Sequence, residues 1–324
     1  MTTIDAIHSE LAPELKQLND LIAKRLQSPN ELMTRVVNGY LRTKGKQIRP
    51  ILVILTAKLF GEVNSESIAA AASVEMLHNA SLIHDDVIDE SKIRRGAATV
   101  NSVWDNHIAV LVGDFFTSTS LAIAAETGKG KLVGALAKLG RMLSIGELDQ
   151  IYNAQSHRLD EKAYFEVIYR KTASLFVTCV EMGACSVGAS DADTARMCRF
   201  AELLGLCFQI RDDIFDYFDS KEIGKPTGND LREGKVTLPL LHALTASDHP
   251  RRAEMLEVIN HDELTTVEID RLITFAKEAG GIEYAYATME RLCAEGMEIL
   301  SNFKECGAID SFRTLFRYII ARRY

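Results

Sequence analysis

The sequence predicts an all-α protein, and two observations carry that prediction. Apolar residues recur three and four positions apart through most of the 324 residues, as between Leu203 and Ile214, whereas alternation with a period of two is scarce. The six prolines agree, because none interrupts a long periodic run, and Pro50, Pro239 and Pro250 stand where helices would begin. We therefore expect helices along the whole chain.

The periodic runs predict helices in order along the chain at residues 10–27, 50–59, 66–90, 103–126, 133–153, 161–187, 194–219, 238–246, 251–259, 265–278, 282–302 and 309–322. No Pro- or Ser-rich linker and no change of composition divides them, so residues 1–324 are expected to form a single domain. The TGKGK sequence at 127–131 lacks the spacing of a phosphate loop and is predicted to be a turn between helices.

Composition and charge exclude several classes of function. The net charge of −8 and the pI of about 5.6 argue against nucleic acid as a partner. The N-terminus lacks the pattern of a signal or transit peptide, which predicts a cytoplasmic protein. The apolar run at 51–57 is shorter than the about 20 residues that cross a bilayer, so no membrane span is expected.

An acidic turn, HDDVIDE, follows a long apolar helical run and places three aspartates close together. Asp85 and Asp89 are four residues apart and share a helix face, and Asp86 lies one step around the helix. Like charges at that distance repel, so they need either solvent or a cation between them. Alone, the DDxxD pattern also fits a solvated helix end.

A second copy of the pattern, FQIRDDIFD, favours the explanation that a cation lies between the aspartates. Asp212, Asp213 and Asp216 each lie 127 residues after their counterparts in the first copy. Two acidic turns that end two apolar helices suggest carboxylates that face each other across a cavity. Oxygen ligands without His or Cys favour Mg²⁺, which commonly bridges carboxylates to the phosphates of a substrate. The pattern therefore predicts a phosphorylated ligand.

Cationic residues at loops and helix ends could bind the phosphate groups of such a ligand. Each alone is more often a surface charge, but Arg grips phosphate oxygens with two donors and Lys acts as a point charge, so a mixed set suits a diphosphate. The set comprises Lys46, Arg49, Arg94, Arg95, Lys171, Lys225 and Lys235.

At this point the sequence resembles a known family, the all-trans polyprenyl diphosphate synthases, and in particular the long-chain bacterial octaprenyl, heptaprenyl and solanesyl enzymes. Residues 45–241 carry its landmarks in order: GKQIRP, EMLHNASLIHDD, DDVIDESKIRRG, LVGDF, GELDQ, RKTASLF, FQIRDDIFD and GKPTGNDLREGKVTLPLL. The resemblance implies an isoprenoid-synthase-type helical bundle around a central cavity, and a homodimer. It also implies condensation of isopentenyl diphosphate with an allylic diphosphate such as farnesyl or geranylgeranyl diphosphate.

The resemblance also assigns roles to individual residues. About three Mg²⁺ per site would be held by Asp85, Asp86, Asp89, Asp212, Asp213 and Asp216. The allylic diphosphate would contact Arg94, Lys171, Lys225 and Lys235, and isopentenyl diphosphate would contact Lys46, Arg49, His78 and Arg95. Thr172 and Gln209 would lie beside the allylic cation and, with Lys171 and Lys235, form the catalytic set.

The expected reaction is ionisation of the allylic carbon–oxygen bond, attack of the isopentenyl alkene on the cation, and loss of a proton. The cavity beyond the metals must then exclude water. Ala80, five residues before Asp85, is small where short-chain members tend to be bulky, so the resemblance predicts a long product, with Ser81 and Leu77 also lining the tunnel. Such products usually become quinone side chains, and a transient membrane contact during product release is expected.

Several other interpretations compete with this one. A short-chain geranylgeranyl diphosphate synthase would share the motifs, and a terpene cyclase or a head-to-head condensing enzyme would share the fold, but the latter two need no isopentenyl site. A metal-dependent phosphohydrolase is suggested by the HD pair of His84 and Asp85, without other His ligands at supporting positions. A catalytically silent subunit of a heteromeric synthase is disfavoured, because both acidic motifs are intact.

Overall fold

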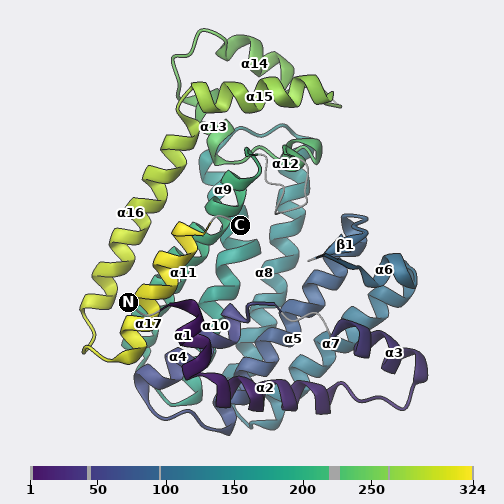
Figure 1. The fold of residues 1–324 in the computed structure, drawn as a ribbon, viewed down its shortest axis with the longest axis vertical. Coiled ribbons are helices and arrows are strands. Elements are labelled where there is room, and N and C mark those ends of the chain that lie inside the picture. Colours follow the sequence, from purple (N-terminus) through teal and green to yellow (C-terminus); the bar gives the residue numbers. More distant parts are fainter. Residues whose placement is uncertain (1–2, 42–44, 95, 219–226, 262, 323–324) are drawn as a thin grey trace. The chain divides into compact units, whose positions relative to one another are not determined.

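The computed structural model describes residues 3–41, 45–94, 96–218, 227–261 and 263–322, which are mostly helical, as the sequence predicts (Figure 1). The chain divides into two compact units. The first comprises Met1–Arg141, Leu175–Cys198 and Glu305–Thr314; the second comprises Met142–Ser174, Arg199–Lys304 and Leu315–Tyr324. That residues 1–324 form a single domain stays a prediction.

The first unit is built on long apolar helices and one short hairpin. Its elements are α1 (Ile4–Glu10), α2 (Ala12–Arg25), α3 (Glu31–Tyr40), α4 (Ile48–Phe60), α5 (Ser65–Ile88), β1 (Ile93–Arg94), β2 (Ala97–Ala98), α6 (Val100–Val103) and α7 (Asn106–Glu126). The first part of α8 (Gly130–Gln155), most of α10 (Ser174–Ser186), and the beginnings of α11 (Asp191–Phe215) and α17 (Gly307–Ala321) belong to it as well.

Helix α5 forms the centre of this unit, and the sequence explains both its start and its burial. Asn64 caps its first turn by accepting from the backbone N–H groups of Glu66 and Ser67, as in a capping box. Four consecutive alanines, 69–72, are buried, as expected for a helix that is apolar all round. Helix α7 packs along it, and the first acidic turn stands at the end of α5.

The second unit completes α8, α11 and α17 and adds the remaining helices. These are α9 (Glu161–Ile168), the π-helical segment η1 (Tyr169–Ala173), α12 (Asn229–Arg232), α13 (Leu238–Thr245), α14 (Arg252–Val258), α15 (Thr266–Glu278) and α16 (Gly281–Ser301). Figure 1 shows α14 and α15 next to each other beyond α13, and a buried apolar cluster that includes Leu240, Leu244, Met255, Leu272 and Phe275 joins them.

Several elements differ from the sequence-based expectation. The helix expected over 161–187 contains the π-helical segment η1, and the helices α1, α3, α6 and α12 and the hairpin β1–β2 were not predicted. In the hairpin, Ile93 pairs with Ala98 and Arg94 pairs with Ala97. The TGKGK turn is confirmed, because α7 ends at Glu126 and α8 begins at Gly130, with Gly128 in the left-handed region at φ 70°.

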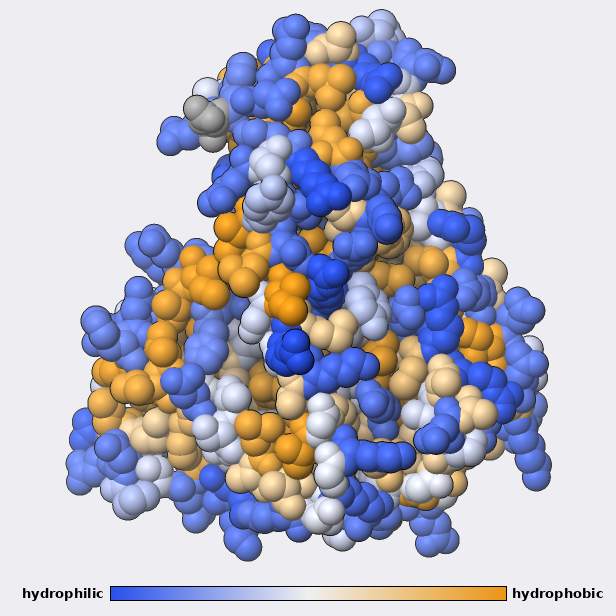
Figure 2. Space-filling model, turned by 180° about the vertical axis from the view of Figure 1, so that it is seen from behind, coloured by the Kyte–Doolittle hydropathy of each residue, from blue (hydrophilic) through white to orange (hydrophobic). Residues whose placement is uncertain are grey.

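Apolar side chains also reach the surface, as the orange areas of one face in Figure 2 illustrate. In the first unit Val110 and Leu111 of α7 are 41% and 62% exposed. By length and composition alone, α7 is the one helix among the described residues that could cross a membrane, and 39% of its apolar window is buried. Fully buried Phe116 and Ser120 belong to the same helix, as in a core helix that packs on a neighbour.

Candidate active site

The first acidic turn closes helix α5 in the first unit. Asp85 is half-buried, Asp86 is 6% exposed, and Asp89 is the exposed C-cap residue, whose backbone N–H donates to Asp85 O at 2.8 Å. The helix end is held by α7 at Gly113, where an added Cβ would lie 2.2 Å from His84 Nε2. The glycine of the LVGDF motif therefore lets α7 approach the residue that precedes the acidic turn.

Asp86 ties the hairpin to the acidic turn. Arg94, on β1, donates from Nε to Asp86 Oδ1 at 2.7 Å, and Asn101 Nδ2 and Ser91 N donate to the Asp86 carbonyl oxygen at 3.0 and 2.9 Å. The Asp86 side chain is buried and that of Arg94 is 34% exposed, so the charged hydrogen bond holds the guanidinium at the edge of the turn. Arg94, expected to contact the allylic diphosphate, is thus held next to the first motif, while Arg95 lies outside the described residues.

The residues expected to bind isopentenyl diphosphate also belong to the first unit. Lys46 is exposed just before α4, Arg49 lies in the first turn of α4, and His78 is 6% exposed on α5. The guanidinium of Arg49 lies 5.8 Å from the ring centroid of Phe176. Helices α4 and α5 pack on each other, so Arg49 and His78 stand on neighbouring helices. Their role in binding isopentenyl diphosphate stays a prediction.

The residues expected to set product length lie on the same stretch of α5. Ala80 is 1% exposed and Leu77 is 7% exposed, whereas Ser81 is half-buried and donates from Oγ to the His78 carbonyl oxygen at 2.9 Å. Next to Ala80, Asn79 accepts a hydrogen bond from Tyr40 Oη at 3.0 Å. Helix α3, which carries Tyr40, therefore packs on this part of α5.

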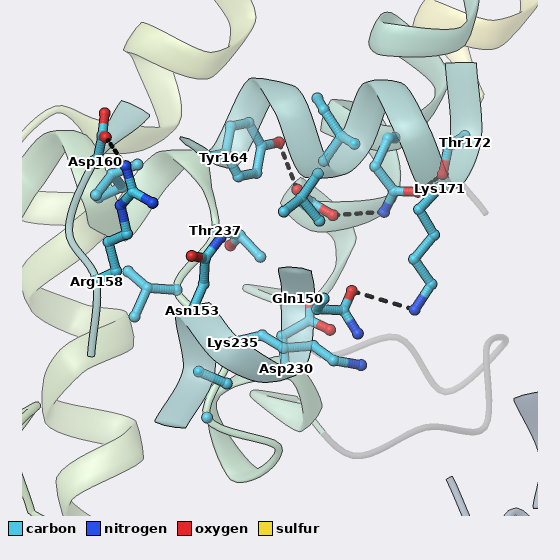
Figure 3. Close-up of a pocket in the computed structure, with 18 residues that line it drawn as sticks. Gln150, Asn153, Arg158, Asp160, Tyr164, Lys171, Thr172, Asp230, Lys235 and Thr237 are labelled. Atoms are coloured by element: carbon cyan, nitrogen blue, oxygen red, sulfur yellow. Dashed lines mark hydrogen bonds and ion pairs between the residues drawn. The ribbon is translucent and has the colours of Figure 1, made fainter. Parts of the chain in front are cut away.

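The second unit contains a cavity of about 180 Å³ that is lined by all four residues of the expected catalytic set (Figure 3). Among the residues that line it are Gln150, Tyr164, Lys171, Thr172, Gln209, Asp213, Asp230 and Lys235. These come from α8, from α9 and η1, from α11, and from the segment around α12. Lys225, expected to contact the allylic diphosphate, lies outside the described residues.

A π-helical turn presents Lys171 and Thr172 to this cavity. Such segments are rare and recur at functional sites. The glycine of the GELDQ motif lets α8 approach this segment closely. An added Cβ on buried Gly146 would lie 2.9 Å from Arg170 Cβ and 3.0 Å from Lys171 N. Lys171 Nζ then reaches Glu147 Oε2 at 2.5 Å and Gln150 Oε1 at 3.2 Å, the second of which Figure 3 marks.

The second acidic turn ends α11 and has three differently partnered carboxylates. Asp212 accepts from Arg322 Nη2 at 2.6 Å, and Asp213, 4% exposed, accepts from Tyr164 and Gln209. Asp216 accepts from the backbone N–H groups at the start of α12, from Asn229 at 2.9 Å and from Asp230 at 3.0 Å. Asp216 therefore anchors α12 beside the turn.

The surroundings of Asp213 and Asp230 disfavour the charged form of both carboxyl groups. Burial raises the pKa of Asp213, hydrogen bonds from Tyr164 and Gln209 lower it, and the neighbouring carboxylates of Asp212 and Asp216 raise it again. Burial, followed by the charges of Asp213 and Asp216, raises the pKa of Asp230. Such a cluster of oxygen ligands is favourable when a cation lies among them.

This donor set fits a hard divalent cation. Among the described residues, no three His, Cys, Asp or Glu side chains converge on one point as a preformed metal cage. Mg²⁺ commonly takes only one or two carboxylates and completes its shell with water and phosphate oxygens, so such a cage is not required. The acids of the two motifs lie in different units, and their joint role in metal binding stays a prediction.

Sequence reasoning missed several residues of this site. Tyr164, which contacts Asp213, carries no motif, whereas Glu147 and Gln150, which contact Lys171, stand in the GELDQ landmark but were given no role. Asp230 stands in the GNDLREGK sequence, whose acid could have been noted because it lies between Lys225 and Lys235, both assigned to the diphosphate. Its proximity to Asp213 was not visible in the spacing.

A family model described as polyprenyl synthetase matches residues 30–275, more than half of the chain. An octaprenyl diphosphate synthase of Haemophilus influenzae is 35% identical over 286 residues, 88% of this chain and 87% of its own length. Component 2 of the heptaprenyl diphosphate synthase of Geobacillus stearothermophilus is 34% identical over 325 residues, 99% of each chain.

A solved structure agrees over the whole chain. The polyprenyl synthase of Caulobacter crescentus, crystallised with calcium and isoprenyl diphosphate, superposes with a TM-score of 0.91 at 31% identity and covers 100% of this chain and 99% of its own. Fold, motifs and relatives together define a prenyltransferase. The chain belongs to the polyprenyl synthetase family, the family of the polyprenyl diphosphate synthases.

Proposed function

We propose that this enzyme condenses isopentenyl diphosphate with farnesyl or geranylgeranyl diphosphate and releases a long all-trans polyprenyl diphosphate. The observation that carries the proposal is the cavity of the second unit, which brings Lys171, Thr172, Gln209 and Lys235 together beside Asp213. These are the residues that would hold the allylic diphosphate and line the path of the cation.

The cofactor of the proposed reaction is Mg²⁺. When bound, it would neutralise charge on the departing diphosphate, and Asp85, Asp89 and Asp212 are the protein ligands that we propose for it. Lys171 and Lys235 would donate to the same diphosphate, and Arg94 would do so from the hairpin. Each lysine pairs with a carboxylate in the structure, Lys171 with Glu147 and Lys235 with Glu233, and would exchange that partner for the diphosphate.

The bond changes follow from this arrangement. The allylic carbon–oxygen bond breaks and its electron pair leaves with the diphosphate; the isopentenyl double bond then forms the new carbon–carbon bond. A proton leaves to restore a double bond, and the released diphosphate would accept it. Apolar side chains of the cavity, among them Val167, Ile168 and Leu241, would keep water from the cation.

The long-chain assignment rests on Ala80 and on the relatives. Ala80 leaves room on α5 five residues before the first acidic turn, and the relatives reported above carry octaprenyl and heptaprenyl names. A geranylgeranyl diphosphate synthase is the competing product class, and a terpene cyclase would consume no isopentenyl diphosphate. In this proposal the enzyme acts in the cytoplasm as a homodimer and supplies quinone side chains.

The test is product analysis with the purified chain, Mg²⁺, labelled isopentenyl diphosphate and primers of several lengths. We expect incorporation of label into prenyl chains longer than twenty carbons. One relative is named as component 2 of its synthase. The protein is therefore assayed without any second subunit, so that the activity measured belongs to this chain. Label that stops at geranylgeranyl length would contradict the long-chain assignment, and no incorporation with any primer would contradict the proposed function.

A further inference from the structure

Three consecutive hydrogen bonds join Tyr164 to Thr172 along the wall of the cavity. Tyr164 donates from Oη to Asp213 Oδ2 at 2.6 Å. Gln209 donates from Nε2 to Asp213 Oδ1 at 2.8 Å. Thr172 donates from Oγ1 to Gln209 Oε1 at 2.6 Å. The dashed lines between Tyr164 and Thr172 in Figure 3 follow this chain across the second unit.

The order of donors and acceptors fixes the side-chain amide of Gln209. Gln209 Nε2 lies 2.8 Å from Asp213 Oδ1, so the NH₂ group of the amide faces the Asp213 carboxyl group. The carbonyl oxygen then faces Thr172 and accepts from its hydroxyl. A reversed amide would set two acceptors against each other. Because a carbonyl oxygen has two acceptor positions, Oε1 keeps one for the cavity.

Tyr164 completes this chain from the buried side. Its side chain is 8% exposed, that of Asp213 is 4% exposed, and the ring of Tyr164 packs edge-on against Phe165 at 5.4 Å between centroids. Both side chains are largely shielded, and a buried carboxylate that loses a hydrogen-bond donor is penalised. Without the phenol hydroxyl, the Asp213 carboxylate gains freedom to rotate, and the Gln209 amide loses its fixed partner.

We propose that Tyr164 is a positioning residue for prenyl transfer: through Asp213 it sets the orientation of Gln209 and Thr172 toward the reacting carbon. The inference rests on the proposed function, in which those two side chains lie beside the allylic cation. Tyr164 itself need not touch either substrate. Its effect is expected on the chemical step rather than on the binding of isopentenyl diphosphate, whose expected contacts Lys46, Arg49 and His78 belong to the first unit.

The test compares Tyr164→Phe with Tyr217→Phe. Both substitutions remove one buried phenol hydroxyl. The hydroxyl of Tyr217, however, forms a hydrogen bond with Thr237 Oγ1 at 3.0 Å and takes no part in the hydrogen bonds that join Tyr164 to Thr172. With farnesyl diphosphate, isopentenyl diphosphate and saturating Mg²⁺, we expect Tyr164→Phe to lower kcat about 10-fold or more. The KM for isopentenyl diphosphate should stay within about twofold of wild type, and Tyr217→Phe should keep the wild-type kcat.

Two further measurements separate positioning from damage to the fold. Calorimetry with farnesyl thiodiphosphate, an unreactive allylic analogue, should give Tyr164→Phe a wild-type affinity. In a Gln209→Ala background, Tyr164→Phe should cause no further loss of kcat, because a residue that acts through Gln209 has nothing left to position. Additive losses, or a collapse of analogue binding that matches the loss of kcat, would overturn the proposal.

The outcomes also distinguish the inference from the function on which it rests. A wild-type enzyme that incorporates no isopentenyl diphosphate contradicts the proposed function. A wild-type enzyme that elongates normally beside an equally active Tyr164→Phe contradicts only the role of Tyr164. Should Tyr164→Phe fail to fold, Thr172→Val removes the donor at the other end of the chain, and a wild-type kcat in that variant would overturn the inference.

Discussion

Arg322 donates a hydrogen bond from Nη2 to Asp212 Oδ1 at 2.6 Å, so the last described residue of the chain contacts the second acidic turn. The guanidinium also lies 4.0 Å from the ring centroid of Phe208. The Arg322 carbonyl oxygen accepts from Arg211 Nε at 2.9 Å and from Nη2 at 2.7 Å. Carboxylates that hold metals are commonly oriented by such outer partners. The end of α17 thus supports a candidate magnesium ligand.

We predict that Arg322→Ala raises the Mg²⁺ concentration needed for half-maximal activity by roughly 10-fold, because Asp212 loses the donor that orients it. Initial rates measured against Mg²⁺ concentration check this. Arg313→Ala is the matched control on the same helix, since Arg313 pairs with exposed Glu305. A lower Mg²⁺ requirement in Arg322→Ala would mean instead that the arginine competes with the metal.

Gly146→Ala tests the contact between α8 and the π-helical segment. The new methyl group would meet Arg170 Cβ and Lys171 N at 2.9 and 3.0 Å, so η1 must shift and carry Lys171 with it. We expect at least ~10-fold lower kcat at a stability cost of about 1–3 kcal/mol. Gly140→Ala on the same helix, where an added Cβ meets no atom within 4 Å, should leave both unchanged. Equal activity of the two variants would refute the role given to Gly146.

Ala80→Phe tests the proposed tunnel. The position is buried on α5, at 1% exposure. In the proposed function it lines the path of the growing chain, where a phenyl group would stop elongation early. Chromatography of products from farnesyl and isopentenyl diphosphates should show shorter chains with turnover retained. Ala125→Phe, at an exposed position of α7, serves as control. An unchanged product length would remove Ala80 from the tunnel.

The capping box of α15 predicts a pH dependence of stability. Hydrogen bonds from the side chain and backbone of Thr265 lower the pKa of Glu268 to about 2, with a further contribution from His261. The folded-state pKa is depressed, so this contribution is fully present above the ordinary pKa near 4.5 and is lost as pH falls toward 2.

Glu268→Gln should therefore unfold more easily than wild type at pH 7, with a difference that shrinks between pH 5 and 3. Urea midpoints measured across that range check the expectation. Glu263→Gln, an exposed neighbour, is the control. A difference that stays constant with pH would show that the charge of Glu268 does not contribute.

Helix periodicity predicted the main scaffold because long apolar runs leave little ambiguity. Helices α5, α7, α8 and α16 lie close to the ranges read from the sequence. The π-helical segment was missed because no local pattern distinguishes it from an α-helix, and its close approach to Gly146 of another helix is visible only in the fold. The hairpin was missed because two residues per strand are too few for an alternating pattern.

Motif spacing predicted the acids and cations but not how they are partnered. The register placed Asp85 and Asp89 on one face, yet it could not reveal that Asp86 holds Arg94, or that Asp216 anchors α12. Tyr164 carries no motif of its own in the sequence. It enters the site because α9 packs beside α11, which is a consequence of tertiary structure.

The most direct test of the central claim measures isopentenyl diphosphate consumption by wild type, Asp85→Ala and Asp212→Ala with saturating Mg²⁺ and farnesyl diphosphate. Loss of a ligand from either acidic turn should lower turnover by on the order of 100-fold or more while circular dichroism stays unchanged. Near-normal turnover in either folded variant would contradict the claim that both turns hold the metal ions of prenyl transfer.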